Sequence, residues 1–183
     1  MTPHRNLDTF ANRFGKRQKL ARLLWNITAA LLYRTSPRPC HGWRRFLLRR
    51  FGAKIGAGAK PYPKAIIWAP WNLTLGERCW LADGVDYYNV APIVIGDDAV
   101  ISQRAVLCTG THDFRSPTFP LVAKPIRVGN GAWVAAEAFV GPGVEIGEGG
   151  IVGARACTFR DVPPWTIVTG NPASEVKQYE MNG

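Results

Sequence analysis

Cysteine pairs, clustered histidines and long apolar runs are all missing from this 183-residue sequence. Its four cysteines, Cys40, Cys79, Cys108 and Cys157, show neither disulfide-type nor metal-type spacing, and there are only three histidines. A zinc site on such a chain needs about three converging Cys or His ligands, so we expect no metal. With no disulfide framework and no signal peptide, the sequence predicts a reducing, cytoplasmic location.

Motifs of several functional classes are absent as well. No G-x-S-x-G elbow supports a serine hydrolase, and no G-x-G-x-x-G or P-loop stands between a strand and a helix. The apolar part of the N-terminal region is shorter than the roughly 20 residues that cross a bilayer. The basic region also lacks the interleaved aromatics of a nucleic-acid reader, so we expect no nucleic-acid partner.

The positive charge is confined to the first third of the chain. Residues 1–60 contain fourteen Lys or Arg and a single acid, Asp8, whereas residues 61–183 contain nine Lys or Arg and twelve acids. The overall net charge of +10 therefore describes the N-terminal region and not the rest.

The strongest positive signal is a six-residue repeat within residues 126–157. Every sixth position is a large aliphatic residue, the next is Gly or Ala, and the fourth position after the aliphatic one is small or modest. The aliphatic positions are Val128, Val134, Val140, Ile146 and Val152, and the fourth positions are Ala132, Ala138, Val144, Gly150 and Ala156. A helix repeats its apolar residues every 3.6 positions and a strand every 2, so this period fits neither alone.

A six-residue period is typical of a parallel β-helix, in which each repeat is one short strand and a turn. The aliphatic side chain points into a narrow prism, the next position is a tight corner, and three such edges would make an eighteen-residue coil. The alternative is a generic Gly-rich β domain. Cys79 falls on a small inward position and is expected to be a buried thiol.

The repeat predicts three regions. Residues 1–54 form a basic helical segment with a polar, frayed start; residues 55–163 form the β-helix; and residues 164–183 form a tail in which the stretch from Glu175 fits a short helix. Within the β-helix, a two-residue slip at Pro92–Ile93 shifts the register. The stretch 109–125 (TGTHDFRSPTFPLVAKP) fits no repeat and is expected to be an extruded loop.

The N-terminal region predicts two helices, over about 13–33 and 42–51. A broad apolar stripe is expected on the first helix, formed by Leu20, Leu23, Leu24, Ile27 and Leu31 and extended by Trp25. In the second, Phe46, Leu47 and Phe51 should face one way and Arg44, Arg45, Arg49 and Arg50 the other. Two compatible roles follow: a cap on the open end of the solenoid, or an interfacial element, residues 13–54, resting on an anionic membrane.

Among the three histidines, His112 is the best candidate for a catalytic residue. His4 lies in the polar start and His41 in the basic segment, whereas His112 opens the one loop that leaves the solenoid. A neutral imidazole can take a proton from an alcohol during its attack on an electrophile. The alternative is a loop histidine that only bonds backbone, and the spacing alone favours neither.

The repeat, the His-bearing loop and the ending TFRDVPPWTIVTGNPA resemble the hexapeptide-repeat acetyltransferases, which form a left-handed parallel β-helix. The similarity covers nearly the whole chain. Its N-terminal block LLWNITAALLYRTSPRPCHGWRRFLLRRFGAKIG and its loop THDFRSPTF are similar to the colanic acid biosynthesis branch, which is related to the maltose and galactoside O-acetyltransferases.

This resemblance implies a homotrimer with active sites between subunits and acetyl-CoA as co-substrate. His112 matches the catalytic base that deprotonates the acceptor hydroxyl for direct attack on the thioester, so no acyl-enzyme forms. Asp113 is expected to orient the imidazole or to contact the sugar.

Further residues carry over by position. For the cofactor, Trp133 would lie beside the pantetheine arm, Ala136 and Ala154 would offer it backbone groups, and Arg160 and Lys177 would meet CoA phosphates. For the acceptor, the implied residues are Asp86 and Asn89. Two positions depart from the pattern, since relatives tend to have Gly at Arg104 and Thr at Phe159.

The resemblance thus implies an O-acetyltransferase that acts on a sugar hydroxyl in exopolysaccharide or capsule assembly. The acceptor is either a sugar or a lipid-linked oligosaccharide, and the basic N-terminal segment suits an acceptor carried on a lipid at the inner face of the membrane. The alternatives are an acetyltransferase for a small soluble sugar or amino sugar, and a non-catalytic β-helix scaffold.

Overall fold

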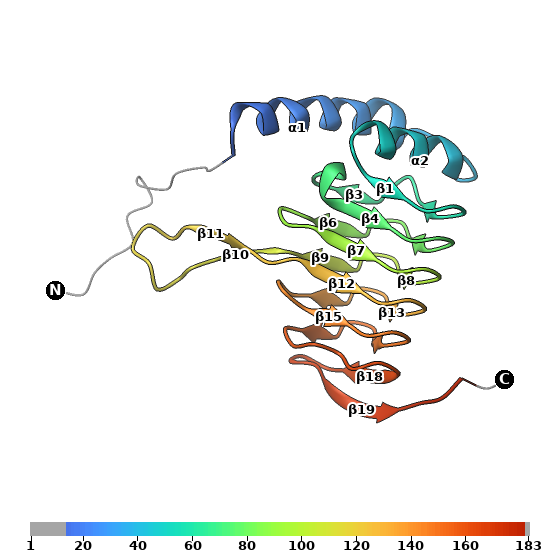
Figure 1. Ribbon diagram of the computed structural model, residues 1–183, viewed down its shortest axis with the longest axis vertical. Helices are drawn as coiled ribbons and strands as arrows, with labels where there is room; N and C mark the ends of the chain where they lie inside the picture. The colour runs from blue at the N-terminus through green and yellow to red at the C-terminus, as the bar shows by residue number, and fades with distance from the viewer. Residues whose placement is uncertain (1–13, 182–183) are drawn as a thin grey trace.

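The computed structural model describes residues 14–181 and shows a parallel β-helix with two helices across its first coil (Figure 1). The polar segment 1–13, which contains His4, lies outside the described residues. The fold confirms the β-helix that the six-residue period predicts, with an N-terminal helical segment and one extruded loop.

Short strands stack into three sheets, which form the three faces of the solenoid. Sheet A contains β1 (Lys54–Ile55), β4 (Leu73–Leu75), β7 (Ile93–Ile95), β12 (Ile126–Val128) and β15 (Glu145–Ile146). Sheet B contains β2 (Lys60–Pro61), β5 (Trp80–Leu81), β8 (Val100–Ile101), β13 (Trp133–Val134), β16 (Ile151–Val152), β18 (Thr166–Thr169) and β19 (Ser174–Gln178). Sheet C contains β3 (Ile66–Ile67), β6 (Asp86–Tyr88), β9 (Val106–Cys108), β14 (Phe139–Val140) and β17 (Cys157–Thr158).

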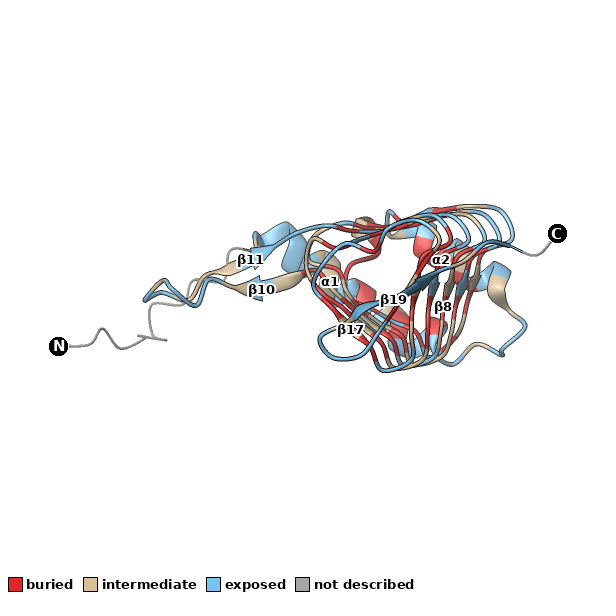
Figure 2. Ribbon diagram, turned by 90° about the horizontal axis from the view of Figure 1, so that it is seen from below, coloured by how far each residue is buried: buried red, intermediate tan, exposed pale blue. Residues whose placement is uncertain are grey.

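The interior of the solenoid follows the six-residue template. The aliphatic positions are buried, as are the small positions four residues on, and Cys79 is buried among them as predicted. Viewed along the axis, the buried residues line the inside of the stacked coils (Figure 2). Each coil is closed only by its neighbours, because one layer of side chains cannot shield itself from water.

The Gly positions after the aliphatic residues are needed for close packing between coils. A Cβ on Gly129 would lie 2.6 Å from the backbone nitrogen of Glu148 in the next coil, a distance no side chain tolerates. The corner is therefore restricted by the neighbouring backbone more than by a special φ angle.

The first coils are longer than the expected eighteen residues. Ile55 pairs with Leu75, and Leu75 pairs with Ile95, a spacing of 20 residues, whereas Val128 pairs with Ile146 at a spacing of 18. The extra residues lie in the turn from sheet C to sheet A, called here the C–A corner. The first C–A corner holds the short helix η3 (Pro70–Asn72), and the third holds the extruded loop.

The C-terminal tail is β structure, and the short helix expected from Glu175 is wrong. β18 adds to sheet B beside β16, and β19 pairs antiparallel with β18. Alternation of Val176 with charged neighbours suits an edge strand as well as a helix turn, and the backbone of β18 provides the pairing partner.

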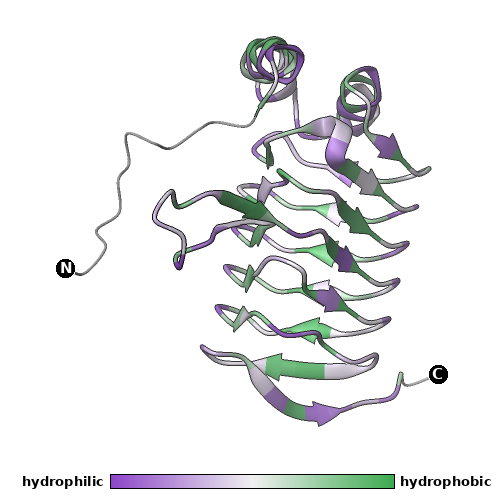
Figure 3. Ribbon diagram, turned by 60° about the vertical axis from the view of Figure 1, so that its left-hand side comes forward, coloured by the Kyte–Doolittle hydropathy of each residue, from purple (hydrophilic) through white to green (hydrophobic). Residues whose placement is uncertain are grey.

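Helices α1 (Lys16–Thr28) and α2 (His41–Arg50), joined through the π-helical turn η2 (Ala29–Tyr33), lie across the first coil (Figure 3). Trp25 is buried and its indole N–H donates to the carbonyl of Ile67 at 2.7 Å. Leu47 and Leu48 of α2 are buried in the same hydrophobic cluster. The helices therefore cover the open end of the solenoid, the capping role that the sequence offered.

Arg44 corrects the predicted polarity of α2. It was expected to point away with the other arginines, but it is fully buried. Its guanidinium donates to the carbonyls of Pro61, at 2.7 Å, and Pro37, at 2.8 Å, and to the hydroxyl of Ser36. Phe46, expected on the buried face, is 51% exposed. Carbonyls at the solenoid end need donors, and the guanidinium supplies several at once.

Candidate active site

The extruded loop is a β-hairpin that leaves the solenoid at the third C–A corner. It consists of β10 (Gly110–His112) and β11 (Leu121–Ala123), paired antiparallel, and it projects away from the coils (Figure 1). Its base is tight, because a Cβ on Gly110 would lie 2.7 Å from the ring of Tyr88 in the coil above. The hairpin is thus held against the coil that carries Asp86 and Tyr88.

His112, the last residue of β10, is held at two points. Its Nδ1 lies 2.9 Å from the carbonyl oxygen of Phe119, and its ring stacks on the Phe119 ring with centroids 4.3 Å apart and planes 2° apart. A carbonyl only accepts, so Nδ1 carries the hydrogen and the lone pair of the neutral imidazole is on Nε2. This orientation is the one a general base needs.

Asp113 was expected to orient the imidazole of His112 or to contact the sugar. Its carboxylate accepts from the backbone N–H of Arg115 at 3.0 Å and so shapes the turn of the hairpin. The carbonyl of Phe119, and not Asp113, faces Nδ1 of His112. The predicted contact of Asp113 with a sugar stays a prediction.

Cys108 lies just before the hairpin, and its thiol donates to the carbonyl of Gly110 at 3.2 Å. Burial raises the pKa of the Cys108 thiol above its ordinary value. A thiol with a raised pKa is a poor nucleophile at neutral pH, because the thiolate is the reactive form.

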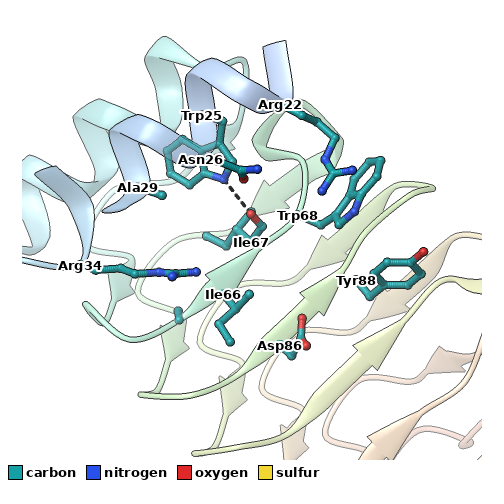
Figure 4. Close-up of a pocket in the computed structure, with 11 residues that line it drawn as sticks. Arg22, Trp25, Asn26, Ala29, Arg34, Ile66, Ile67, Trp68, Asp86 and Tyr88 are labelled. Atoms are coloured by element: carbon teal, nitrogen blue, oxygen red, sulfur yellow. Dashed lines mark hydrogen bonds between the residues drawn. The ribbon is translucent and has the colours of Figure 1, made fainter. Parts of the chain in front are cut away.

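A cavity of about 300 Å³ lies between α1 and the upper strands of sheet C. Figure 4 shows Arg22 and Asn26 reaching down from α1, and Trp68, Asp86 and Tyr88 facing them from the solenoid. The Arg22 guanidinium stacks over Trp68, with its carbon 3.9 Å from the ring centroid. Hydrogen-bonding and charged groups here surround a space of the size of a small ligand.

Asp86 is the predicted acceptor residue that lines this cavity. Burial raises the pKa of its carboxyl above the ordinary value. Arg34, from the end of the helical segment, lines the same cavity. An ionisable side chain with a raised pKa in a cavity is a frequent feature of functional sites.

Sequence reasoning missed the contribution of the helical segment to this cavity. Arg22 and Arg34 stand among twelve other basic residues in the first 60 positions, and nothing in the sequence pattern separates them. Trp68 and Tyr88 carry the better signal, because they interrupt the six-residue template at successive C–A corners.

Asn89, the other predicted acceptor residue, is fully buried. Its side-chain oxygen accepts from the N–H of Ala69 at 2.9 Å, and its side-chain nitrogen donates to the carbonyl of the same residue at 2.6 Å. This reciprocal pair joins two coils. We therefore do not carry Asn89 forward as an acceptor residue.

Three predicted cofactor residues lie on sheet B and on the turn from B to C. Trp133 is 45% exposed on β13, and its indole N–H donates to the hydroxyl of Ser102 at 2.8 Å. Ala136 and Ala154 occupy the same turn in successive coils, where the carbonyl of Ala136 accepts from the N–H of Arg155 at 2.9 Å. The pantetheine contacts expected of the Ala136 and Ala154 backbones stay predictions.

The two predicted phosphate-binding residues lie near the last coils. Arg160 is exposed and lines a pocket of about 210 Å³ with Phe159 and the segment 172–174. Lys177 is exposed on the edge strand β19. Arg104, which departs from the family pattern, adopts a φ of 59° and donates to the carboxylate of Glu137 in the next coil.

One subunit does not bring His112 and Trp133 together. The His112 hairpin leaves the corner between sheets C and A, whereas Trp133 lies on sheet B, the face opposite that corner. The His112 hairpin follows directly after a strand of sheet C, and the cavity that contains Asp86 is also lined by strands of sheet C. Among residues 14–181, no group of three or more His, Cys, Asp or Glu side chains is placed to hold a metal ion.

No family model matches the chain. The "Putative colanic acid biosynthesis acetyltransferase WcaF" of Escherichia coli K12 is 44% identical over 155 residues, which are 85% of each chain.

Solved structures share the fold at lower identity. A galactoside acetyltransferase in complex with coenzyme A superposes with a TM-score of 0.82 at 20% identity, over 91% of this chain and 84% of that one. A hexapeptide-repeat acetyltransferase of Vibrio cholerae in complex with acetyl coenzyme A gives 0.83 at 23% identity, over 93% of each. These structures have the same parallel β-helix. Together with the WcaF match, they show that the chain belongs to the WcaF family of hexapeptide-repeat acetyltransferases and is itself an acetyltransferase.

Proposed function

We propose that this acetyltransferase moves an acetyl group from acetyl-CoA to a sugar hydroxyl in colanic acid or related exopolysaccharide assembly, with His112 as the general base. The observation that carries the proposal is the imidazole of His112, whose Nδ1 faces the Phe119 carbonyl and whose ring is stacked. The name of the WcaF relative supports the pathway, and the complexes with CoA and acetyl-CoA support the donor.

In the proposed reaction, Nε2 of His112 removes the proton from the acceptor hydroxyl as its oxygen attacks the thioester carbonyl. The carbon–oxygen bond forms, the carbon–sulfur bond breaks, and the departing sulfur takes the proton back from the imidazolium. No cysteine intermediate is required, in agreement with the raised pKa of Cys108. The transfer is therefore direct.

The donor would lie along the solenoid, with its pantetheine arm beside Trp133, Ala136 and Ala154. Arg160 and Lys177 would then bind its phosphates near the last coils. Because Trp133 lies opposite the corner that bears His112, the complete site needs two subunits. This supports the homotrimer, in which the hairpin of one subunit reaches the sheet B of the next.

The acceptor would occupy the cavity under α1, where Asp86 and Arg22 offer a hydrogen-bond acceptor and donors for sugar hydroxyls. Asp113 remains a second candidate contact from the hairpin. The acceptor is proposed to be attached to a membrane lipid, because the cavity lies directly beneath α1, the basic helix that covers the open end of the solenoid. A small soluble sugar or amino sugar is the alternative acceptor.

The test is release of CoA thiol from acetyl-CoA against a panel of sugars and nucleotide sugars, with titration of CoA binding by calorimetry. His112→Ala should lower acceptor-dependent turnover by about 10²–10⁴-fold, the usual contribution of a general base. CoA binding should be unchanged, since His112 acts on the acceptor.

Thr118→Ala provides a matched control on the same hairpin, because Thr118 is exposed at its tip. It should keep its turnover, and all variants should melt at the wild-type temperature. Full activity of His112→Ala would disprove the assigned base. Failure of the wild-type protein to bind CoA would favour a non-catalytic scaffold.

A further inference from the structure

Helix α1 presents its apolar side outward. Leu20, Leu23, Leu24 and Ile27 of α1, together with Leu31 of η2, are called here the outer face of α1 and are each between 50% and 65% exposed. Leu23 and Ile27 stand two residues on either side of the buried Trp25, which at 3.6 residues per turn places them on the opposite side of the helix. A surface helix normally buries such a stripe.

The outer face of α1 continues onto α2. Trp43 and Phe46 are 42% and 51% exposed, and their rings stack with centroids 5.7 Å apart. The Trp43 indole N–H donates to the carbonyl of Leu32 at 3.1 Å, which fixes the ring beside the end of the first helical segment. Contiguous apolar surface of this kind marks an interaction site more often than an accident of packing.

The charged residues of the segment that carries this surface are all basic. Lys16, Arg17 and Lys19 are exposed in the first turns of α1. Between residues 14 and 76 the chain contains thirteen Lys or Arg and no Asp or Glu. A second copy of the same surface would therefore meet like charge with no acid to pair it, whereas an anionic surface would be complementary.

We propose that the outer face of α1, with Trp43 and Phe46, inserts into the headgroup region of an anionic phospholipid bilayer. The geometry is that of an interfacial helix: leucines enter the boundary of the acyl chains, the tryptophan stays at headgroup level, and basic side chains meet lipid phosphates. No helix within residues 14–181 is long and apolar enough to cross a membrane, so the contact is peripheral.

Membrane binding would also explain how the acceptor reaches its cavity, and this part of the proposal rests on the proposed function. Arg22 and Asn26 line the acceptor cavity from the inner side of the same helix whose outer side would touch lipid. The cavity would then lie about one helix diameter, roughly 10–12 Å, from the bilayer surface. An acceptor carried on a membrane lipid would reach it without leaving the membrane.

The test is co-sedimentation of the full chain with vesicles of phosphatidylcholine alone and of phosphatidylcholine with phosphatidylglycerol. The wild-type protein should bind the anionic vesicles at least tenfold more tightly, and the affinity should fall as salt is raised. Leu24→Asp/Ile27→Asp should lower the affinity at least tenfold, without a change in melting temperature, because both side chains are exposed.

Val176→Asp is the matched control, since Val176 is 58% exposed at the other end of the solenoid. It should sediment like the wild-type protein, and so should His112→Ala, which keeps the assay independent of acetyl transfer. Absence of wild-type binding to anionic vesicles at low salt would overturn the proposal. So would a Leu24→Asp/Ile27→Asp variant that changes the oligomeric state but not vesicle binding, which would assign the face to a second copy.

Discussion

The coils of the solenoid and helix α1 point their branched apolar side chains in opposite directions. In the coils, residues such as Leu107 and Val134 are fully buried and the outside is mixed. In α1, the leucines point to solvent, and a single indole, Trp25, provides the main inward contact. Both regions have a regular apolar pattern, so the pattern alone does not distinguish a side chain that holds the fold from one that meets a partner.

The comparison separates the side chains that stabilise the fold from those that are available to bind a partner. Removal of a coil side chain leaves a cavity that the rigid stack cannot close, whereas removal of an α1 leucine removes surface that water already covers. The following substitutions test that division, beginning with the largest effect on stability.

Leu107→Ala and Leu24→Ala delete the same atoms in the two regions. Leu107→Ala should lower the free energy of unfolding by about 2–5 kcal/mol, because Leu107 is fully buried in the third coil. Leu24→Ala should change it by no more than about 0.5 kcal/mol, as expected at an exposed site. Chemical denaturation of both variants measures the contrast, and equal losses would show that α1 is packed against something in the free protein.

Arg44→Ala tests how the helical end is attached to the coils. The guanidinium donates to the carbonyls of Pro61 and Pro37, and the carbonyl of the buried Pro61 would lose that donor away from solvent. We expect a loss of about 2–3 kcal/mol in the free energy of unfolding. Arg50→Ala is the control, since Arg50 is exposed on the same helix and should cost far less. Similar losses for the two would mean that Arg44 contributes only its charge.

The sequence was sufficient for the solenoid because its period is dictated by geometry that repeats. Val128, Val140 and Ile146 each meet the same three-sided interior, so one template predicts all of them, and it also predicts where the loop with His112 must leave. The buried position of Cys79 follows from the same template.

The rest could not be predicted, because it depends on contacts between parts distant in the chain. The burial of Arg44 depends on the Pro61 carbonyl of the first coil and on the Pro37 carbonyl before α2, and a helical wheel of α2 contains neither of them. The reciprocal pair between Asn89 and Ala69 likewise joins neighbouring coils 20 residues apart. Arg22 joins the candidate site only because α1 folds back over Trp68.

Asp86 lies on a coil of the solenoid but faces α1, so it belongs to both of the regions compared. Its substitution should have the smallest effect on stability. Burial raises the pKa of its carboxyl, so the folded state disfavours the ionised form. Below the ordinary pKa of about 4, both states are protonated and this cost is absent. As the pH rises through the ordinary and then the raised pKa, the cost appears in full.

Asp86→Asn should therefore stabilise the protein slightly at neutral pH, within about 0.5 kcal/mol, and the gain should vanish below about pH 4. Melting temperatures of the two proteins across this range measure it; a gain that grows as the pH falls would contradict the sign. The same substitution should raise the KM for the acceptor while leaving CoA affinity unchanged. A higher melting temperature together with a higher acceptor KM would mean that Asp86 serves acceptor binding at a cost in stability. A change in melting temperature with an unchanged KM would mean that Asp86 acts on packing alone.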